Sequence, residues 1–262
     1  MKKILALILT LIMAFSFVAC SNNKTMVLVA EKESAGEEVA TTHEDFKDFT
    51  YTAVDTQAKA LMEVSSGTAD AAIVDYVMSI GSIGEGTDYE NLVIEGEGYA
   101  EESYGIAFRK GSDFTAKVNE AIKTLKDNGK LTEIAKTYKL EELILANDEF
   151  DAFKQSETDS DWEYIKNKGE LVIGITYFAP MNYENEEGEL VGFETEFAKA
   201  VCEELGIKAK FQEISWAAKE TELSAKNIDC IWNGMTITEE RLENMSISIP
   251  YMQNKQVKVV KK

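Results

Sequence analysis

The chain has 262 residues, of which 45% are hydrophobic and 28% are charged, as in folded globular proteins and unlike a disordered chain. Acidic residues outnumber basic ones 47 to 27, and the formal net charge is −20. We therefore expect no nucleic-acid partner and no membrane binding by bulk charge attraction.

Residues 1–20 have the composition of a signal peptide. Lys2 and Lys3 precede an apolar stretch that is shorter than the roughly 20 residues needed to span a bilayer, and small residues lead into Cys20. The arrangement resembles a bacterial lipoprotein signal, in which Cys20 would be lipidated and would anchor the mature protein to the outer face of the cell membrane. Ordinary signal cleavage, with a secreted soluble product, is the alternative.

After this segment, short apolar strands alternate with amphipathic helices, which predicts an α/β architecture with parallel sheets. In the first series, one helix begins after Ser34. A second helix carries Leu61 and Met62 and stops at Gly67. The strands of this series are expected at 26–30, 49–54, 71–75 and 91–95.

The middle of the chain is predicted to be mainly helical. A strand at 104–108 is followed by apolar residues at helical spacing over 114–125 and by a shorter helix over 131–138. Residues 147–161 are acidic and hold few apolar side chains, so we expect them to form a surface linker.

A second series of strands and helices resembles the first. One helix runs from Phe193 and is capped by Gly206, another follows Trp216, and strands are expected at 171–175, 209–214 and 229–233. Each series is small for an independent domain, so together they suggest two similar lobes.

Cysteine and histidine offer little support for metal binding or catalysis. Cys202 and Cys230 could form one disulfide, or both could be buried thiols that pack as small hydrophobic side chains. His43 is the single histidine. Without a second histidine or a CxxC motif, we expect no zinc site, no other metal site and no His-based catalytic dyad.

Several longer motifs resemble one family in combination. They include "APMNYENEEGELVGFETEFAKAVCEELG", "DCIWNGMTITEERLENMSISIPY" and "GTADAAIVDY". All are similar to the polar amino acid binding proteins of bacterial ABC importers, solute-binding protein family 3, over residues 26–262. The resemblance implies a two-lobed, periplasmic-binding-protein-like (type II) α/β clamp with mixed, mainly parallel sheets. It further implies capture of a free amino acid without a cofactor, and delivery to an ABC transporter permease outside the cytoplasm.

The order of the motifs is rearranged relative to that family and resembles a circular permutation. The expected parts are lobe 2 at 26–98, a hinge crossover at 99–108, helices completing lobe 1 at 109–146, the linker at 147–161, and the main part of lobe 1 at 162–262. Cuts in exposed connections are tolerated where chain termini lie close together. Lobe 1 would end in a hinge strand, and we expect residues 256–260 to lie beside the crossover by hydrogen bonding.

A zwitterionic amino acid needs a cation for its carboxylate and an anion for its ammonium group. The resemblance assigns the carboxylate to Arg241 of "TITEER", whose planar guanidinium can donate two parallel hydrogen bonds. Thr236 and the backbone at Gly234 and Met235 would add donors. Thr236 and Glu239 also have the spacing of a helix capping box, and Arg241 could instead pair with a nearby acid.

The other lobe would supply the anion. Asp75 matches the family position that holds the α-ammonium group, although an aspartate at the end of a strand can also cap a helix. Ser34 and Ala35 begin a helix and would present N–H groups to the ligand carboxylate.

The ligand side chain would lie between Phe178 and Trp216, which match the family's stacking positions but could equally be core residues. Asn233 would add a polar contact. Ile175 stands where several relatives carry an aspartate that reads basic or amide side chains, and this favours a neutral or polar ligand over lysine or arginine.

Two other functions remain as alternatives. A few relatives of this fold dehydrate small carboxylates, which requires a general acid or base within reach of the substrate, but no motif singles out such a residue. A ligand-sensing module of a membrane receptor is disfavoured, because no signalling segment is apparent. We therefore expect a binding protein and not an enzyme.

Overall fold

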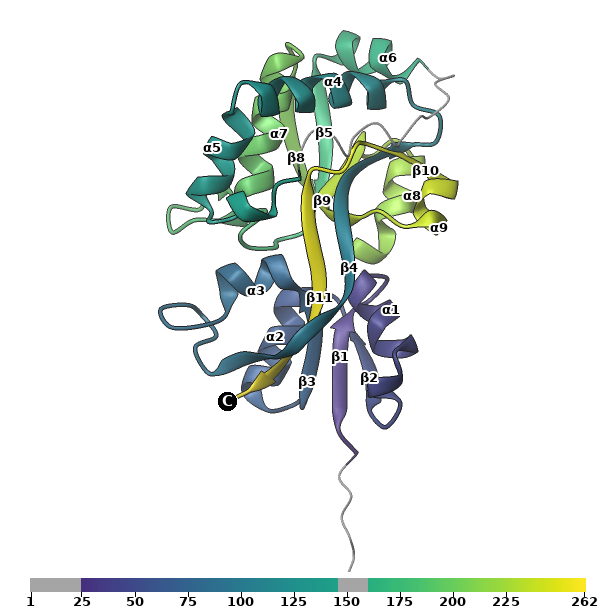
Figure 1. The fold of residues 1–262 in the computed structure, drawn as a ribbon. Helices are drawn as coiled ribbons and strands as arrows, with labels where there is room; N and C mark the ends of the chain where they lie inside the picture. The colour runs from purple at the N-terminus through teal and green to yellow at the C-terminus, as the bar shows by residue number, and fades with distance from the viewer. Residues whose placement is uncertain (1–24, 146–159) are drawn as a thin grey trace, which may run out of the picture.

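The computed structural model describes residues 25–145 and 160–262. The expected signal peptide, Cys20 and most of the expected linker lie outside the described residues. One large mixed sheet has the strand order β2-β1-β3-β11-β4-β9-β5-β8, and β10 pairs with β4. Its helices form two bodies, one at each end of the sheet, joined by β4 and β11 (Figure 1).

Lobe 2, the lower body in Figure 1, holds the first elements of the chain. The Ser34 hydroxyl accepts a hydrogen bond from the N–H of Glu37 and so caps α1, while Gly67 ends α2 with a φ of 82°. Strands β1 and β2 are parallel, as are β1 and β3. The elements are β1 (Val27–Glu31), α1 (Ala35–Thr42), β2 (Thr50–Val54), α2 (Gln57–Ser66), β3 (Ala71–Asp75) and α3 (Tyr76–Ser82).

Lobe 1, the upper body, holds the remaining helices and the parallel strands on either side of β5. Its core packs Phe197 against Trp232 and Tyr251, and Cys202 and Cys230 are both buried with free thiols. The elements are α4 (Phe114–Asp127), α5 (Lys130–Thr137), α6 (Asp161–Lys168), β5 (Glu170–Ile175), β6 (Tyr183–Glu184), β7 (Leu190–Val191), α7 (Phe193–Glu204), β8 (Lys208–Glu213), α8 (Lys219–Ser224), β9 (Cys230–Thr236), α9 (Glu239–Asn244) and β10 (Met245–Ile247).

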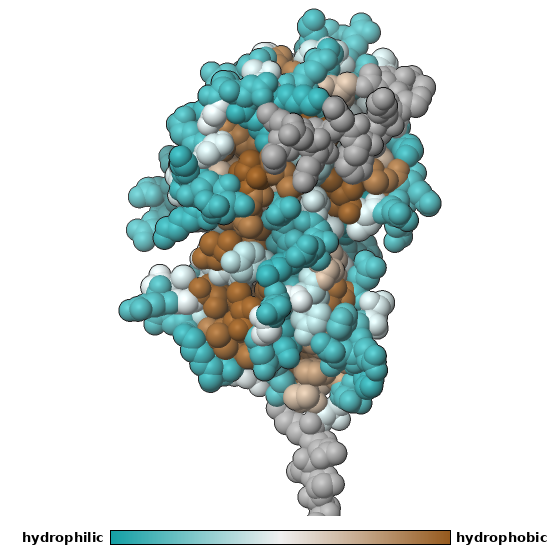
Figure 2. All heavy atoms as spheres, viewed as in Figure 1, coloured by the Kyte–Doolittle hydropathy of each residue, from teal (hydrophilic) through white to brown (hydrophobic). Residues whose placement is uncertain are grey.

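Two long strands connect the lobes. The separate strands expected at 91–95 and 104–108 are one continuous strand, β4 (Leu92–Arg109). The last strand, β11 (Met252–Lys261), runs antiparallel to β4 and also pairs with β3, where Gln256 lies opposite Asp75. Residues 256–260 are therefore paired, as expected, but mainly with β3 and with residues 93–95 of β4. Of the crossover at 99–108, only Tyr99 lies opposite this segment, at Gln256. In the space-filling view, apolar side chains gather where the lobes approach each other, and hydrophilic ones cover most of the rest of that face (Figure 2).

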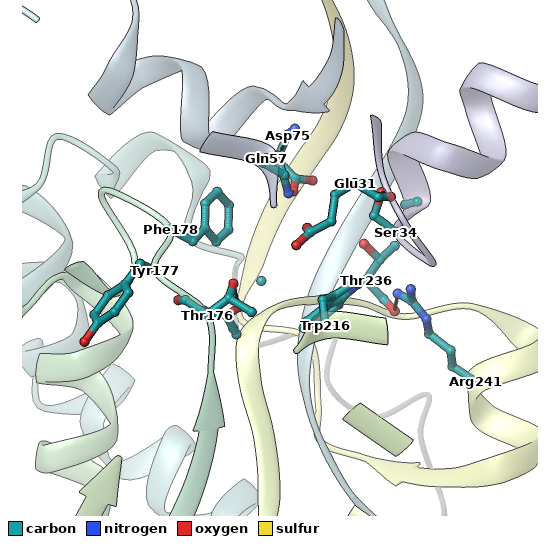
Figure 3. A pocket seen from close by; sticks show the side chains of 13 residues that line it. Glu31, Ser34, Gln57, Asp75, Thr176, Tyr177, Phe178, Trp216, Thr236 and Arg241 are labelled. Carbon is teal, nitrogen blue, oxygen red and sulfur yellow. Dashed lines mark hydrogen bonds between the residues drawn. The ribbon is translucent and has the colours of Figure 1, made fainter. Parts of the chain in front are cut away.

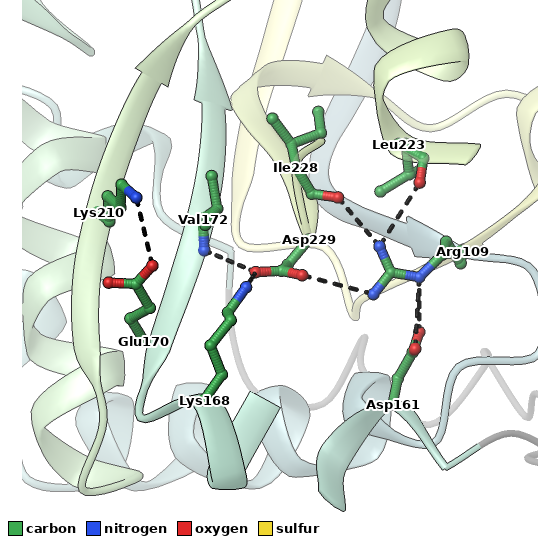
Figure 4. A network of polar contacts seen from close by, with 9 residues as sticks. All are labelled: Arg109, Asp161, Lys168, Glu170, Val172, Lys210, Leu223, Ile228 and Asp229. Carbon is green, nitrogen blue, oxygen red and sulfur yellow. Dashed lines mark hydrogen bonds and ion pairs between the residues drawn. The ribbon is translucent and has the colours of Figure 1, made fainter. Parts of the chain in front are cut away.

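Asp161, which we expected in the surface linker, is buried in lobe 1. It is the first residue of α6, is 3% exposed, and accepts a hydrogen bond of 3.0 Å from Nε of Arg109 (Figure 4). Arg109 also lies 3.6 Å from Asp229 and donates to the carbonyl of Ile228, and Lys168 pairs with Asp229. The linker prediction is wrong at this position because acidic composition cannot reveal a buried cation from a distant strand.

This network predicts a large loss of stability for Asp161→Ala. Removing one partner of a buried ion pair leaves Arg109 with less compensation for its desolvation, so the free energy of unfolding should fall by about 3–5 kcal/mol. Urea denaturation followed by circular dichroism measures it. Glu163→Ala, an exposed acid on the same helix, is the control and should stay within about 0.5 kcal/mol. Equal effects of the two substitutions would contradict the prediction.

Candidate ligand-binding site

A pocket between the two lobes brings together all nine residues that the sequence suggested (Figure 3). The space left between the side chains is about 10 Å³, close to that of one water molecule, so the lobes are closed on each other. The lining residues from lobe 2 are Glu31, Ser34, Ala35, Gln57 and Asp75, and those from lobe 1 are Thr176, Tyr177, Phe178, Trp216, Asn233, Gly234, Thr236 and Arg241.

Arg241 supplies the guanidinium at one end of the pocket. Its Nη1 donates to the carbonyl of Thr236 at 2.8 Å, and its Nη2 donates to the carbonyl of Glu33 in lobe 2 at 3.4 Å. Among the described residues it forms no ion pair, so its charge is not neutralised by a neighbouring acid in direct contact. Burial lowers the pKa of this guanidinium.

The helix that carries Arg241 is capped differently from the expectation. Thr238, not Thr236, is the N-cap of α9, and its hydroxyl accepts from the N–H of Arg241 at 3.2 Å. Thr236 ends the buried strand β9 two residues earlier, so its side chain cannot cap α9 but lines the pocket. The capping-box spacing of Thr236 with Glu239 was therefore misleading, because the strand extends to Thr236.

One carbonyl oxygen of lobe 2 meets several donors of lobe 1. Besides Arg241, the indole N–H of Trp216 donates to the Glu33 carbonyl at 3.2 Å, and Nζ of Lys219 donates to it at 3.3 Å. Lys219 is 3% exposed and lies 4.8 Å from the centre of the Trp216 ring. Burial, with the charge of Arg241, lowers the pKa of Lys219 to about 8. This corner of the pocket thus concentrates positive charge.

Asp75 supplies a carboxylate from the end of β3. Its Oδ1 accepts from Gln256 at 2.7 Å and from Asn254, and its Oδ2 accepts from Gln57. It makes no side-chain cap to α3, so the capping alternative is wrong. Three amides therefore hold this carboxylate in place.

Glu31 is a second pocket carboxyl group, and the sequence did not single it out. It is the last residue of β1 and is 4% exposed, and its Oε1 has no hydrogen-bond partner among the described residues. Burial, reinforced by the charge of Asp75, raises its pKa to about 8. The signal that could have found Glu31 is its place at the carboxyl end of a parallel strand, three residues before Ser34.

The polar groups around Gly234 are directed into lobe 1. The N–H of Gly234 donates to the buried carboxyl group of Glu194 at 2.9 Å. Contrary to the expectation, this N–H is therefore not available to a ligand. The side chain of Asn233 is paired with Thr176 through two hydrogen bonds of 2.6 and 2.9 Å. A Cβ on Gly234, which has a φ of 57°, would come within 2.7 Å of the Phe178 ring. Gly234 therefore allows close packing beneath Phe178.

Ser34 and Ala35 begin α1 at the pocket edge. The Ser34 N–H and hydroxyl both donate to the carbonyl of Glu31, at 3.2 and 2.7 Å. Phe178 and Trp216 are both nearly buried and line the pocket on lobe 1. Within the described ranges, no three side chains of the histidine, cysteine, aspartate or glutamate type cluster as metal ligands would.

The buried acids predict that stability falls as the pH rises from 5 to 8. Burial raises the pKa of Glu31 and Glu102 to about 8 and that of Glu194 to about 7, from the ordinary 4.5. Between these values the folded protein holds protons that the unfolded chain releases, so the free energy of unfolding must decrease as pH increases. Thermal denaturation across this range measures it.

Replacement of one such acid tests the cause. Glu31→Gln should reduce the fall in melting temperature between pH 5 and pH 8, because the variant has no proton to lose at this position. The exposed Glu85→Gln is the control and should follow the parent protein. A melting temperature that rises over the same pH interval would contradict the assignment.

Comparisons with known proteins give local matches. Residues 171–262 match the family model "Bacterial extracellular solute-binding proteins, family 3". Over 88 residues the chain is 33% identical to the L-cystine-binding protein TcyJ of Escherichia coli (strain K12). This matched segment covers 33% of this chain and 33% of that protein. Over 86 residues it is 37% identical to a probable amino-acid ABC transporter-binding protein of Haemophilus influenzae, covering 33% and 34%.

A solved structure gives a match of the same extent. The ABC uptake transporter substrate binding protein from Streptococcus pneumoniae with bound histidine is 38% identical, with a TM-score of 0.32, over 33% of this chain and 36% of that chain. The chain spans about a third of the length of the curated relatives it matches. Residues 171–262 are therefore similar to the bacterial extracellular solute-binding proteins, family 3.

Proposed function

We propose that this protein captures a free amino acid between its two lobes outside the cytoplasm and delivers it to an ABC importer. The observation that carries the proposal is the placement of Arg241 on lobe 1 and Asp75 on lobe 2 around one pocket. A guanidinium and a carboxylate on opposite walls are complementary to the carboxylate and ammonium groups of a zwitterion. Several relatives with matching segments are named as amino acid binding proteins, which supports this ligand class.

Binding and closure are coupled in this proposal. The ligand carboxylate takes the place of the Glu33 carbonyl on Arg241, and the ammonium group binds the carboxylate of Asp75. Because these two contacts come from different lobes, the ligand stabilises the closed form through interactions absent from an open one. Phe178 and Trp216 enclose the side chain. The closed shape is then the signal to an ABC transporter permease.

The ligand is proposed to be neutral or polar. Ile175, at the end of β5, is buried, so this strand end places no charged group beside the pocket. An aspartate would be expected there for a basic ligand, on the family resemblance. Two relatives are named for binding cystine and histidine, and neither of these amino acids has a side chain like that of lysine or arginine.

The location is proposed to be the outer face of the cell membrane. The sequence of residues 1–20 supports export and lipidation of Cys20, and the name of the matched family supports an extracellular site. Along the described stretches of chain, every helix is too short or too polar to cross a bilayer. A single lipid chain anchors only marginally, so lipidation would act by keeping the protein near its transporter.

A dehydratase-like enzyme is the second candidate, and one observation favours it. Glu31 is a buried pocket carboxyl group whose raised pKa of about 8 would keep it protonated at neutral pH, as a general acid requires. Incubation with a panel of small carboxylates, analysed for products, separates the two functions. Recovery of every compound unchanged favours the binding protein.

Arg241→Ala tests the carboxylate assignment. Two charge-assisted hydrogen bonds contribute about 1.5–3 kcal/mol each, so the variant should bind its amino acid about 100-fold or more weakly. Calorimetric titration of the common amino acids into the parent protein identifies the ligand first. Lys199→Ala, an exposed cation of lobe 1, is the control and should bind normally. Undiminished binding by Arg241→Ala would remove the assignment.

We also propose that the chain order is a circular permutation of the family order. The pairing of β11 with both β3 and β4 supports it, since the last residues of the chain lie beside the start of the hinge. A rejoined chain, in which residues 160–262 precede residues 25–145, should fold and bind the same amino acid with unchanged affinity. Calorimetry on both chains measures this. A rejoined chain that fails to fold or to bind argues against permutation.

A further inference from the structure

Glu31 has properties that the packing of the protein does not explain. Figure 3 shows its side chain pointing into the pocket between Asp75 and Thr236. It is 4% exposed, and within the described residues its Oε1 has no hydrogen-bond partner and the residue forms no ion pair. A buried polar atom without a partner destabilises the fold. Such groups persist mainly where function requires them.

The surrounding charges do not offset this cost. Lys219 is a cation that favours the ionised form of Glu31, but its Nζ donates to the Glu33 carbonyl at 3.3 Å. Asp75 disfavours a second negative charge beside it, and the nearby amide of Gln57 is held by Asp75, since its nitrogen donates to the Asp75 carboxylate and its oxygen accepts from the Asp75 N–H. Glu31 therefore has an open acceptor position that no side chain of the described residues fills.

The anchors of the proposed ligand lie on either side of Glu31. Arg241 takes the carboxylate, and Asp75, fixed by three amides, takes the ammonium group. Both main-chain groups of the amino acid are then bound without Glu31. The remaining part of the ligand is its side chain, which must pass between Phe178 and Trp216 in the same small pocket.

We propose that Glu31 is a specificity-determining residue that binds the side chain of an uncharged polar amino acid through its N–H or O–H donor. The inference rests on the proposed function and names the ligand class: side chains ending in an amide, a hydroxyl or an imidazole. Because burial raises the pKa of Glu31, its carboxyl group is mainly protonated at neutral pH. A protonated carboxyl group can both accept from and donate to an amide, and it adds no second negative charge beside Asp75.

Pairs of amino acids with the same shape test this selectivity. Calorimetry at pH 7 compares asparagine with leucine and threonine with valine, and glutamine and histidine complete the panel. The parent protein should bind the donor-bearing member of at least one pair about tenfold more tightly, because a buried carboxyl group left unpaired penalises the aliphatic one. Glu31→Gln keeps an acceptor and a donor and should retain the preference.

Glu31→Leu should lose the preference while it still binds through Arg241 and Asp75, and Glu31→Ala replaces it if the leucine variant does not fold. A preference that survives in the leucine or alanine variant overturns the inference, as does a uniform loss of affinity for every ligand. A parent protein that binds amino acids without preference also overturns it and leaves the proposed function intact. A parent protein that binds no amino acid removes the proposed function and the inference together.

Discussion

Buried charges of opposite sign from two different lobes are the constraint on which this site depends. Arg241 and Lys219 lie on lobe 1, whereas the carboxylate of Asp75 lies on lobe 2 beside the mainly protonated Glu31, and in the described part of the chain no ion pair joins the cations to Asp75. Both cations instead donate hydrogen bonds to the backbone carbonyl of Glu33 in lobe 2. Opposite charges that are desolvated but not paired favour a ligand that carries both charges, because it satisfies each wall at once.

Much of the fold was readable from local signals. Ser34 and Gly67 mark helix ends through their own chemistry, and strands rich in apolar residues, such as 71–75 and 171–175, occur where short apolar runs predicted them. Pocket residues such as Arg241 were found because a motif resemblance, not composition, singled them out. Strand ends and helix starts converge in this architecture, so residues distant in sequence meet at one pocket.

The parts that sequence did not reveal depend on long-range contacts. From its sequence context, Asp161 is expected to be a solvent-exposed acid. In the structure it is buried and accepts a hydrogen bond from Arg109, which lies 52 residues earlier in the chain. By sequence, nothing distinguishes Glu31 from the other acidic residues among the 47, and its burial becomes apparent only when lobe 1 packs over the end of β1. Thr238, and not Thr236, caps α9 because β9 continues to Thr236, three residues beyond the strand expected at 229–233. Each case involves a partner that no local pattern specifies.

The position of β11 in the sheet has a consequence for biosynthesis. Lobe 2 is translated first, but one neighbour of its strand β3 is made from the final residues of the chain. Until those residues leave the ribosome, β3 presents an unpaired edge and β4 lacks its longest partner. The sheet of lobe 2 therefore depends on a strand that the chain places after the whole of lobe 1, so lobe 2 cannot complete its sheet from its own consecutive residues.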